Sequence, residues 1–263
     1  MKLGVIGCGN MGNAIAKGIL SSRILPFNSI YISDKDPQKT KELFKKFGIR
    51  LCSNEEMVKK CDVIILAVKP QNSGALLSSI SGLLDGHEHL VSVMAGIAIS
   101  KIESVVARKI AITRAMPNMA ALAGKSATCV CHNNMVESKV FVTRVFSSIG
   151  TVVEMGEEYM DAVTALSGSG PAYFLYLAEC MRDAAIKLGI KGDKASELAV
   201  ATLIGSGALI DSLKVPPEVL RKRITSKRGT TAAALNSLQK AGFKETVELA
   251  LRKAFERSKE LSV

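Results

Sequence analysis

A glycine-rich turn close to the start of this chain limits the folds that it can adopt. Residues 2–6 read as a short buried strand, Gly7-Cys8-Gly9-Asn10-Met11-Gly12 follows it, and residues 14–20 read as a helix. A G-x-G-x-x-G turn that ends a strand and opens a helix is the fingerprint of a dinucleotide-binding unit. The first glycine permits the tight turn, the second lets the backbone approach a pyrophosphate, and the third allows helix and strand to pack closely. We therefore expect all six residues of the turn to contact a dinucleotide at the helix N-terminus.

The end of the next predicted strand bears on the choice of cofactor. Residues 29–33 form that strand, and Asp34 follows it, 22 residues after Gly12. A carboxylate at this place accepts hydrogen bonds from the ribose hydroxyls of NAD and repels the 2′-phosphate of NADP. Lys35 beside it fits that phosphate, and it fits equally well a solvated charge at the start of a helix. We expect NADH or NADPH to bind here, with a modest preference for NADH.

Short apolar strands alternate with helices along the first 155 residues. Further strand candidates, with helical candidates between most of them, are residues 63–68, 90–93, 110–114 and 127–131. This alternation predicts a parallel sheet covered on both faces by helices.

The character of the sequence changes after Met155, because no strand candidate follows. Helices are predicted for residues 161–188 with a turn at Ser167–Pro171, for 195–213 and 216–224, and for 230–261 with a break near Gly242. The predicted fold class is therefore α/β. An N-terminal Rossmann dinucleotide-binding domain at residues 1–156 is followed by an all-helical domain at residues 157–263.

The helix predicted around residues 198–210 has no polar face. Thr202 and Ser206 are its only hydroxyl side chains, and its other side chains are apolar or absent. Such a helix is buried on all sides, and a domain of about a hundred residues hardly surrounds one. We therefore predict that the helical domain packs into a symmetric dimer.

The chain carries an excess of positive charge. Lys and Arg number 35 against 24 Asp and Glu, which gives a net charge of +11. Such a field attracts nucleic acid, anionic membranes, or small phosphorylated and carboxylated molecules. Base-stacking aromatic residues usually accompany nucleic-acid binding, but Trp is absent and aromatic residues are only 5%. We expect small anionic ligands and no nucleic acid.

We expect a cytoplasmic protein without a membrane segment or a metal. The apolar stretch Leu90–Ile99 is about half of the ~20 residues that a membrane span needs, and the N-terminal strand leaves no room for a signal peptide. The six cysteines show no CxxC pairing, which favours reduced, mostly buried thiols. Cys129, Cys131 and His132 lie in a predicted strand without a second pair of ligands, so we expect no metal site there.

Two segments follow strands at the edge where ligands bind in open α/β sheets. Ala67-Val68-Lys69-Pro70 closes one strand, and Asn118 follows Met116-Pro117 after another. Lys69 suits a cofactor contact, or a solvated position ahead of a proline turn. The Asn118 amide has the donor and the acceptor that a carboxamide needs, although Asn after Pro is also ordinary turn chemistry. We expect both segments to bind the cofactor.

One loop of the helical region has the features of an anion site. Ser226-Lys227-Arg228-Gly229-Thr230-Thr231 is rich in hydroxyls, carries two cations and opens the last helix pair. Its free backbone N–H groups and its cations would hold a carboxylate. Capping of the following helix by Thr230 is compatible with that role.

The sequence resembles the pyrroline-5-carboxylate reductases along essentially its whole length. The stretches that carry the resemblance are Gly7–Gly12, Val68-Lys69-Pro70-Gln71, Met116-Pro117-Asn118, Ala165–Tyr173 and Ser226–Thr231. The resemblance implies a Rossmann domain and a helical dimerisation domain with the active site between them. It also implies NAD(P)H-dependent reduction of 1-pyrroline-5-carboxylate to L-proline, the last step of proline biosynthesis, in a homodimer or a pentamer of dimers.

The resemblance also assigns roles within the 226–231 loop. It implies that Thr231 is the catalytic residue, which hydrogen-bonds the ring nitrogen and helps deliver its proton. It further implies that the backbone N–H groups of Gly229 and Thr230, with Ser226 nearby, hold the substrate carboxylate.

The sequence departs from the family pattern at two places. Lys227 and Arg228 stand where the family loop usually has Pro-Gly within Ser-Pro-Gly-Gly-Thr-Thr. We expect this change to affect the rigidity of the loop more than activity. The family commonly has Pro-Asn-Thr-Pro where this chain has Pro117-Asn118-Met119-Ala120. We therefore expect Asn118 to contact the cofactor, but not the two residues that follow it.

Two other functions fit parts of the sequence. Hydroxy-acid dehydrogenases of the 3-hydroxyisobutyrate type share the arrangement of a Rossmann domain and a helical domain. They resemble one another in a GxGxxxK helix whose lysine is catalytic. In this chain the corresponding stretch is Gly168–Phe174, and Phe174 stands at the lysine position. The net charge also suits a dinucleotide-sensing or nucleic-acid-binding protein without turnover. Salt-dependent DNA binding without reductase activity would favour that second alternative.

Overall fold

A computed structural model of the chain describes residues 1–106 and 108–262. By its contacts the chain divides into two compact units, Met1–Ser169 with the segment from Ala254 onward, and Gly170–Lys253. The predicted domain boundary after residue 156 stays a prediction. The first compact unit extends past residue 156 because Met160 and Val163 are buried in its core.

The first unit holds an eight-stranded sheet in the order β3-β2-β1-β4-β5-β6-β7-β8. Its strands are β1 (Leu3–Ile6), β2 (Ile30–Ser33), β3 (Arg50–Leu51), β4 (Val63–Leu66), β5 (His89–Ser92), β6 (Ala111–Met116), β7 (Ser126–His132) and β8 (Gly150–Glu154). Its helices are α1 (Asn10–Ser21), α2 (Pro37–Phe47), α3 (Asn54–Lys60), α4 (Ser73–Ser81), α5 (Ile99–Val105), α6 (Val140–Ser147) and α7 (Met160–Val163). The predicted Rossmann-type sheet is confirmed.

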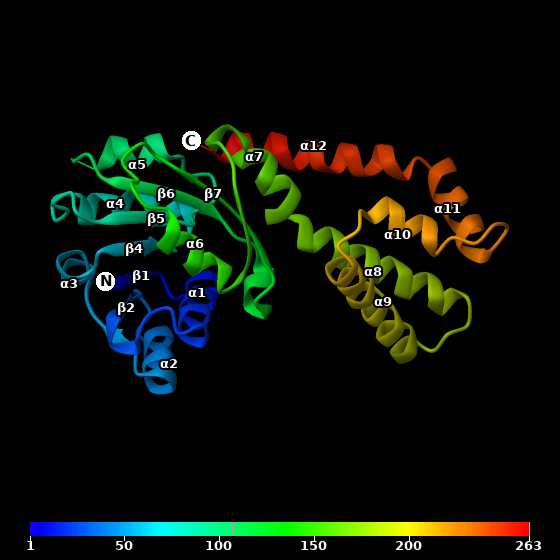
Figure 1. The fold of residues 1–263 in the computed structure, drawn as a ribbon, viewed down its shortest axis with the longest axis horizontal. Helices are drawn as coiled ribbons and strands as arrows, with labels where there is room; N and C mark the ends of the chain where they lie inside the picture. The colour runs from blue at the N-terminus through cyan, green and yellow to red at the C-terminus, as the bar shows by residue number, and fades with distance from the viewer. Residues whose placement is uncertain (107, 263) are drawn as a thin grey trace. The chain divides into compact units, whose positions relative to one another are not determined.

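Alternate residues of the central strands point to opposite faces of the sheet, and each face has its own core. On β4, Val63 and Ile65 pack with residues of α1, α2 and α6, whereas Ile64 and Leu66 pack with residues of α3, α4 and α5. A strand buried on both faces reads as a continuous apolar run, which is why these strands were recognisable from sequence. Figure 1 shows the helices on either side of the sheet.

β7 runs antiparallel to β6, which corrects the prediction of a parallel sheet at this position. Only residues 117–125 join the two strands, and a parallel pair needs a crossover of a dozen or more residues. The link is a 3-10 helix, Met119–Ala123, that ends at Gly124 with a φ of +68°. Two strands were not predicted from the sequence: β3, which has two residues, and β8, whose side chains are mostly exposed.

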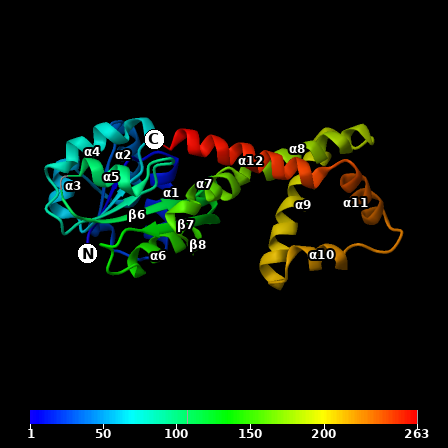
Figure 2. The same ribbon diagram turned by 90° about the horizontal axis from the view of Figure 1, so that it is seen from above.

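The described residues of the second unit form helices and connecting loops without a strand, as predicted. It contains α8 (Gly170–Lys187), α9 (Gly192–Leu213), α10 (Pro217–Arg223), α11 (Thr230–Lys240) and the first part of α12 (Phe243–Leu261). Figure 2 shows these helices from above. The predicted break near Gly242 is confirmed, because this glycine has a φ of +71° between α11 and α12.

α9 is long and apolar enough to cross a membrane by length and composition alone, with a mean hydropathy of 1.3 over 18 residues. The expectation of no membrane segment rested on Leu90–Ile99, whereas the apolar helix at residues 198–210 was assigned to a dimer interface. Most side chains of α9 are exposed in the single chain, Ile204 to 66%. Within the described part of the chain, α8 packs against α9 but leaves most of its apolar side chains uncovered.

Candidate functional site

The three glycines of the first turn are needed for three different reasons. Gly7 has a φ of +101°, and a Cβ there would lie 2.6 Å from the carbonyl oxygen of Ala67. A Cβ on Gly12 would overlap the carbonyl oxygen of Gly7, so its absence lets α1 pack against the turn. Gly9 is the N-cap of α1, and a Cβ there would meet nothing within 4 Å. The space above Gly9, at a helix N-terminus with free N–H groups, is suited to a pyrophosphate.

Both oxygens of the Asp34 carboxylate accept hydrogen bonds from the backbone. The N–H of Cys8 donates to Oδ2 at 2.6 Å, and the N–H of Asp36 donates to Oδ1 at 2.9 Å. These bonds fix the carboxylate beside the glycine turn, and each oxygen keeps a lone pair for a ribose hydroxyl. Burial, followed by the charge of Asp34, raises the pKa of the Cys8 thiol to about 12, so that thiol stays protonated.

A cavity of about 690 Å³ lies along the glycine turn, within the size range of small-molecule and cofactor sites. The predicted cofactor residues that line it are Gly7, Gly9, Asp34, Lys35, Ala67, Val68 and Lys69. The cavity therefore brings together the glycine turn, the end of β2 and the end of β4. The predicted residues that do not line it are Cys8, Asn10, Met11, Gly12, Pro70 and Asn118.

Residues of α2, of α3 and its N-cap, of the turn before α4 and of α4 complete the cavity, and they were not predicted from the sequence. Lys39, Ser53, Asn54 and Asn72 are among its lining residues. The Asn54 Oδ1 atom is buried and has no hydrogen-bond partner among the described residues. One signal could have located this wall: Ser53 and Glu56 have capping-box spacing, and the Ser53 Oγ accepts from the Glu56 N–H at 3.1 Å.

Asn118 is occupied by contacts within the protein. Its Oδ1 accepts from the Ala120 N–H at 3.1 Å, its Nδ2 donates to the Ser167 carbonyl at 2.9 Å, and its own N–H donates to the Ser126 Oγ at 3.1 Å. These bonds tie the turn after β6 to the π-helical turn Thr164–Gly168. The predicted cofactor contact of Asn118 stays a prediction, and the amide keeps one N–H and one lone pair that these bonds do not use.

In the second unit, Ser226–Gly229 forms a β-turn ahead of α11. The N–H of Gly229 donates to the carbonyl of Ser226 at 3.1 Å, and Arg228 has a φ of +65° whereas Lys227 does not have a positive φ. This pattern is typical of a type II turn, which favours Pro at its second and Gly at its third position. Lys227 and Arg228 occupy those positions. The left-handed conformation costs a residue other than glycine about 1–2 kcal/mol.

The first turn of α11 offers backbone donors next to two hydroxyls. The N-cap is Gly229, without a side-chain cap, so the N–H groups of Thr230 and Thr231 have no partner within the helix. The N–H of Gly229 is used in the turn, which revises its predicted role as a donor to the carboxylate. A Cβ on Gly229 would overlap the Ser226 Oγ, so a larger residue there would force the Ser226 side chain to rotate. The hydroxyl of Thr231 makes no hydrogen bond within the described part of the chain.

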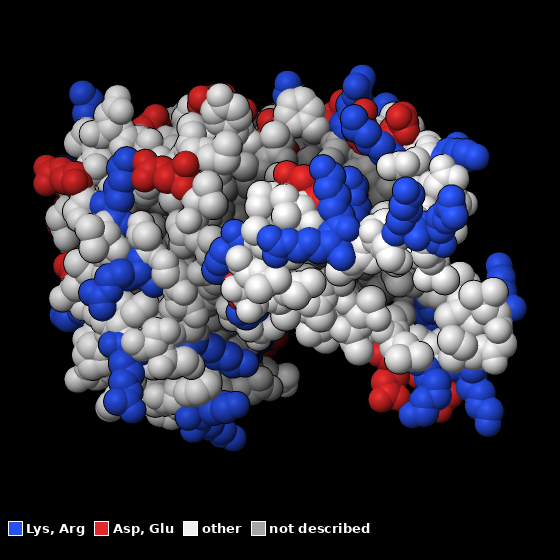
Figure 3. Space-filling model, turned by 45° about the vertical axis from the view of Figure 1, so that its right-hand side comes forward, with Lys and Arg blue, Asp and Glu red and all other residues white. Residues whose placement is uncertain are grey.

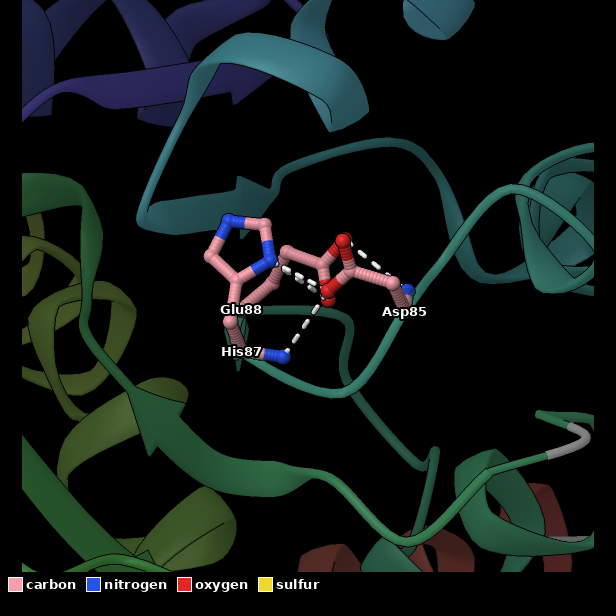
Figure 4. Close-up of side chains that lie close together, drawn as sticks. All are labelled: Asp85, His87 and Glu88. Carbon is pink, nitrogen blue, oxygen red and sulfur yellow. Dashed lines mark hydrogen bonds and ion pairs between the residues drawn. The ribbon is translucent and has the colours of Figure 1, made fainter.

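One surface cluster has side chains of the kinds that bind metals, but these side chains already form hydrogen bonds within the protein. The ligand atoms of Asp85, His87 and Glu88 lie within 4.8 Å of one another (Figure 4). Asp85 hydrogen-bonds both the ring and the backbone of His87, and Glu88 accepts from the N–H groups of Asp85 and Gly86. These bonds account for the cluster as a tight turn between α4 and β5.

The comparisons with known proteins cover both units. A family model described as pyrroline-5-carboxylate reductase dimerisation matches residues 157–261, and one described as NADP oxidoreductase, coenzyme F420-dependent, matches residues 2–96. The pyrroline-5-carboxylate reductases of Methanosarcina acetivorans and Pseudomonas aeruginosa are 35% and 36% identical to this chain, and each alignment covers 99% of this chain and 97% of the relative.

Solved structures of pyrroline-5-carboxylate reductases also resemble this chain over its whole length. A pyrroline-5-carboxylate reductase from Coxiella burnetii has a TM-score of 0.95 and 28% identity, over 100% of this chain and 98% of that one. The pyrroline carboxylate reductase of Plasmodium falciparum, with NADP bound, has a TM-score of 0.85 and 34% identity over the same shares.

The Rossmann sheet, the glycine turn and the fixed Asp34 carboxylate define an NAD(P)-dependent oxidoreductase with a helical second unit. Because relatives at 35% and 36% identity cover nearly its whole length, the chain belongs to the pyrroline-5-carboxylate reductase family. Its helical region carries that family's dimerisation domain, so the chain oligomerises.

Proposed function

We propose that this chain reduces 1-pyrroline-5-carboxylate to L-proline, the last step of proline biosynthesis, with NADH or NADPH as hydride donor. The observation that carries the proposal is the open space over Gly9 at the N-terminus of α1. It occurs in a chain whose relatives over 99% of its length are named pyrroline-5-carboxylate reductases.

The glycine turn and the adjoining cavity hold the cofactor in this proposal. The pyrophosphate lies over Gly9, and the remaining predicted residues of the turn, Cys8, Asn10, Met11 and Gly12, shape its backbone. Asp34 accepts the ribose hydroxyls and sets a modest preference for NADH over NADPH. Residues 67–70, after β4, continue the site towards the nicotinamide.

The reaction demands little side-chain chemistry, because a protonated cyclic imine accepts hydride directly at carbon. The cofactor supplies the hydride. As the hydride bonds to the imine carbon, the π electron pair moves to the ring nitrogen, which keeps its proton. Positioning of the ring supplies most of the acceleration that the protein provides.

The loop that opens α11 binds the substrate in this proposal. The free N–H groups of Thr230 and Thr231 hold the carboxylate, with Ser226 beside them and Gly229 allowing the turn. The Thr231 hydroxyl hydrogen-bonds the ring nitrogen and helps deliver its proton. A helix N-terminus with unpaired N–H groups favours a carboxylate electrostatically.

Oxidation of a hydroxy acid fits the second unit less well. That reaction needs a group that takes up the proton of the alcohol. Phe174 on α8 stands where the 3-hydroxyisobutyrate-type enzymes have their catalytic lysine, and its side chain is 61% exposed. Imine reduction has no such requirement.

The assembled form is a homodimer in this proposal. α8 and α9 pack against each other and leave large apolar side chains exposed, for example Leu175 and Ile204. Both helices lie within the region matched by the dimerisation model. Further assembly into a pentamer of dimers, and a cytoplasmic location, are also part of the proposal.

The first test is a cofactor-oxidation assay with 1-pyrroline-5-carboxylate and either NADH or NADPH. Loss of reduced-cofactor absorbance, with L-proline as the product, is expected with both. The absence of turnover by a folded protein that binds the cofactor would reject the function. Salt-dependent binding to DNA without turnover would support the non-catalytic alternative.

The catalytic role of Thr231 is tested by Thr231→Ala with Thr231→Ser as the matched control. The alanine variant should lower kcat about a hundredfold, in the range for lost general acid–base assistance, and leave cofactor affinity nearly unchanged. The serine variant keeps the hydroxyl and should retain most of the activity. Unchanged turnover in Thr231→Ala would remove this hydroxyl from the mechanism.

A further inference from the structure

The turn before α11 carries cations at the two positions where its geometry favours other residues. A type II turn prefers Pro at its second position, which fixes φ, and Gly at its third, where φ is positive. Here Lys227 and Arg228 stand at those positions, and Arg228 adopts a φ of +65°. Stability alone would select against this pair. Strained residues of this kind are concentrated at functional sites, where the surroundings maintain them.

The same segment is strongly basic. Arg221, Lys222 and Arg223 form the last turn of α10, and Lys227 and Arg228 follow within five residues. The side chains of all five are exposed, and no ion pair to them occurs among the described residues. Figure 3 shows that basic side chains also predominate over acidic ones on the face in view. The turn is therefore surrounded by uncompensated positive charge.

The two turn cations are close to the donors that hold the substrate carboxylate. Consecutive Cα atoms are about 3.8 Å apart, so the Cα of Arg228 lies at most about 8 Å, and that of Lys227 at most about 11 Å, from the Cα of Thr230. Long flexible side chains bring charges from such positions within the Debye length, about 8 Å at physiological ionic strength. Unscreened cations at this range attract an anion and accelerate its encounter with the site.

We propose that Lys227 and Arg228 are specificity-determining residues that select the carboxylate of the cyclic imine, at the expense of turn stability. This inference rests on the proposed function. The cations act on capture of the anionic substrate, and so on KM and kcat/KM. They take no part in hydride transfer itself. Arg228 is the more informative of the two, because its charge and its backbone strain can be changed separately.

Three substitutions of Arg228 separate charge from strain. Arg228→Gln removes the charge and keeps a side chain at positive φ, Arg228→Lys keeps both, and Arg228→Gly removes both. Each variant is assayed with 1-pyrroline-5-carboxylate and with the neutral 1-pyrroline-5-carboxamide, which has the same ring. Lys240→Gln is the matched control, because Lys240 lies ten residues further along α11, about 15 Å from Thr230 and beyond the Debye length.

For the carboxylate, Arg228→Gln and Arg228→Gly should lower kcat/KM about tenfold through KM, as expected for the loss of one charge-assisted contact. For the carboxamide both variants should stay within about twofold of the wild type. Arg228→Lys and Lys240→Gln should resemble the wild type with both substrates. The kcat/KM of the wild type for the carboxylate should also fall more steeply with salt than that of Arg228→Gln. Arg228→Gly should unfold at a higher temperature than the wild type, because glycine adopts the positive φ freely.

Equal losses with carboxylate and carboxamide would overturn the inference, because they would indicate a structural role for Arg228. A loss confined to the Kd of NADH or NADPH would overturn it as well, by assigning the charge to the cofactor phosphates. Unchanged kinetics in Arg228→Gln would have the same consequence. Absence of turnover in the wild type would instead reject the proposed function, and the inference with it.

Discussion

At the scale of single residues, two glycines of the first turn are required by the fold, whereas the third is not. Gly7 and Gly12 are required by the protein itself, because a side chain at either position would collide with neighbouring backbone. Gly9 is not, because its φ of −68° is open to any residue and a Cβ would meet only empty space. The proposed position of the pyrophosphate over Gly9 would account for the absence of a side chain there.

Alanine substitutions of these two kinds of glycine should have opposite effects. Gly9→Ala should leave the unfolding temperature nearly unchanged and raise the Kd of NADH at least about tenfold, equivalent to about 1.4 kcal/mol. Gly12→Ala should destabilise the fold by about 1–3 kcal/mol, because α1 must move away from the turn. Thermal unfolding and cofactor titration by fluorescence measure the two effects. A Gly9→Ala protein that binds NADH normally would contradict the placement of the pyrophosphate.

Asp34 should set the ratio of activities with the two cofactors. Asp34→Asn removes the charge that repels a 2′-phosphate and keeps an acceptor for the N–H of Cys8. The ratio of kcat/KM with NADPH to that with NADH should rise about tenfold, which corresponds to about 1.4 kcal/mol. Lys39→Gln is a useful companion variant, because Lys39 lines the same cavity and forms an ion pair with Asp36. A ratio that does not change in Asp34→Asn would show that the carboxylate serves only the backbone.

Some residues of the candidate site could be predicted from the sequence and others could not, for physical reasons. The glycine turn and Asp34 were predictable because their roles follow from local backbone geometry and fixed spacing. Asn54 was not, because it reaches the cavity only through the packing of α3 against the sheet. The occupied N–H of Gly229 and the occupied amide of Asn118 were also missed, since both depend on which hydrogen bonds the folded chain forms.

At the scale of elements, continuous apolar runs revealed the buried strands, whereas exposed edge strands and the reversal at β7 remained hidden. β6 pairs with β5 on one side and with β7 on the other, and hydrogen-bonded polar side chains connect the three strands. The Thr113 Oγ1 lies 2.7 Å from both His89 Nε2 and His132 Nδ1. One hydroxyl donates to a single ring, so the other ring must donate to it, which neutral imidazoles do. Burial, followed by the charge of His132, lowers the pKa of His89 to about 4.

This chain of side chains should make the fold sensitive to acid. A His with a pKa of about 6.5 when unfolded and about 4 when folded stabilises the protein above pH 6.5, and that contribution disappears as the pH falls through 4. The contribution is about 3 kcal/mol. His89→Gln, which can still hydrogen-bond Thr113, should therefore flatten the fall in unfolding free energy between pH 6.5 and 4.

Exposed His87 provides the control for this measurement. Its hydrogen bond to Asp85 raises its pKa, so its contribution is present below the unfolded pKa and is lost as the pH rises through the folded value. In His87→Gln the unfolding free energy should therefore fall between pH 6.5 and 4 as steeply as in the wild type, or more steeply. Urea unfolding at several pH values measures this dependence. The same decrease in unfolding free energy between pH 6.5 and 4 in the wild type and in His89→Gln would refute the role of His89.

At the scale of the whole molecule, the helical unit cannot bury its own apolar surface. The side chains of Leu175 on α8 and Ile204 on α9 are 64% and 66% exposed in the single chain. Contiguous apolar surface of this kind marks an interface with protein or membrane. α9 meets the length and composition of a membrane span, yet it lies in the region matched by the family's dimerisation model. Association with a second copy is therefore the expected way of covering it.

Ile204→Asp tests which surface covers α9. A buried unpaired carboxylate in a dimer interface is strongly destabilising, by about 3–5 kcal/mol. The variant should therefore shift the protein from a dimer or larger assembly towards monomer in light scattering, while the Rossmann unit still binds NADH. Lys194→Glu, an exposed charge change on the same helix, should leave the assembly unchanged. A wild-type chain that is monomeric at all working concentrations, or that partitions into neutral lipid vesicles, would show instead that α9 is not an interface between copies of the chain.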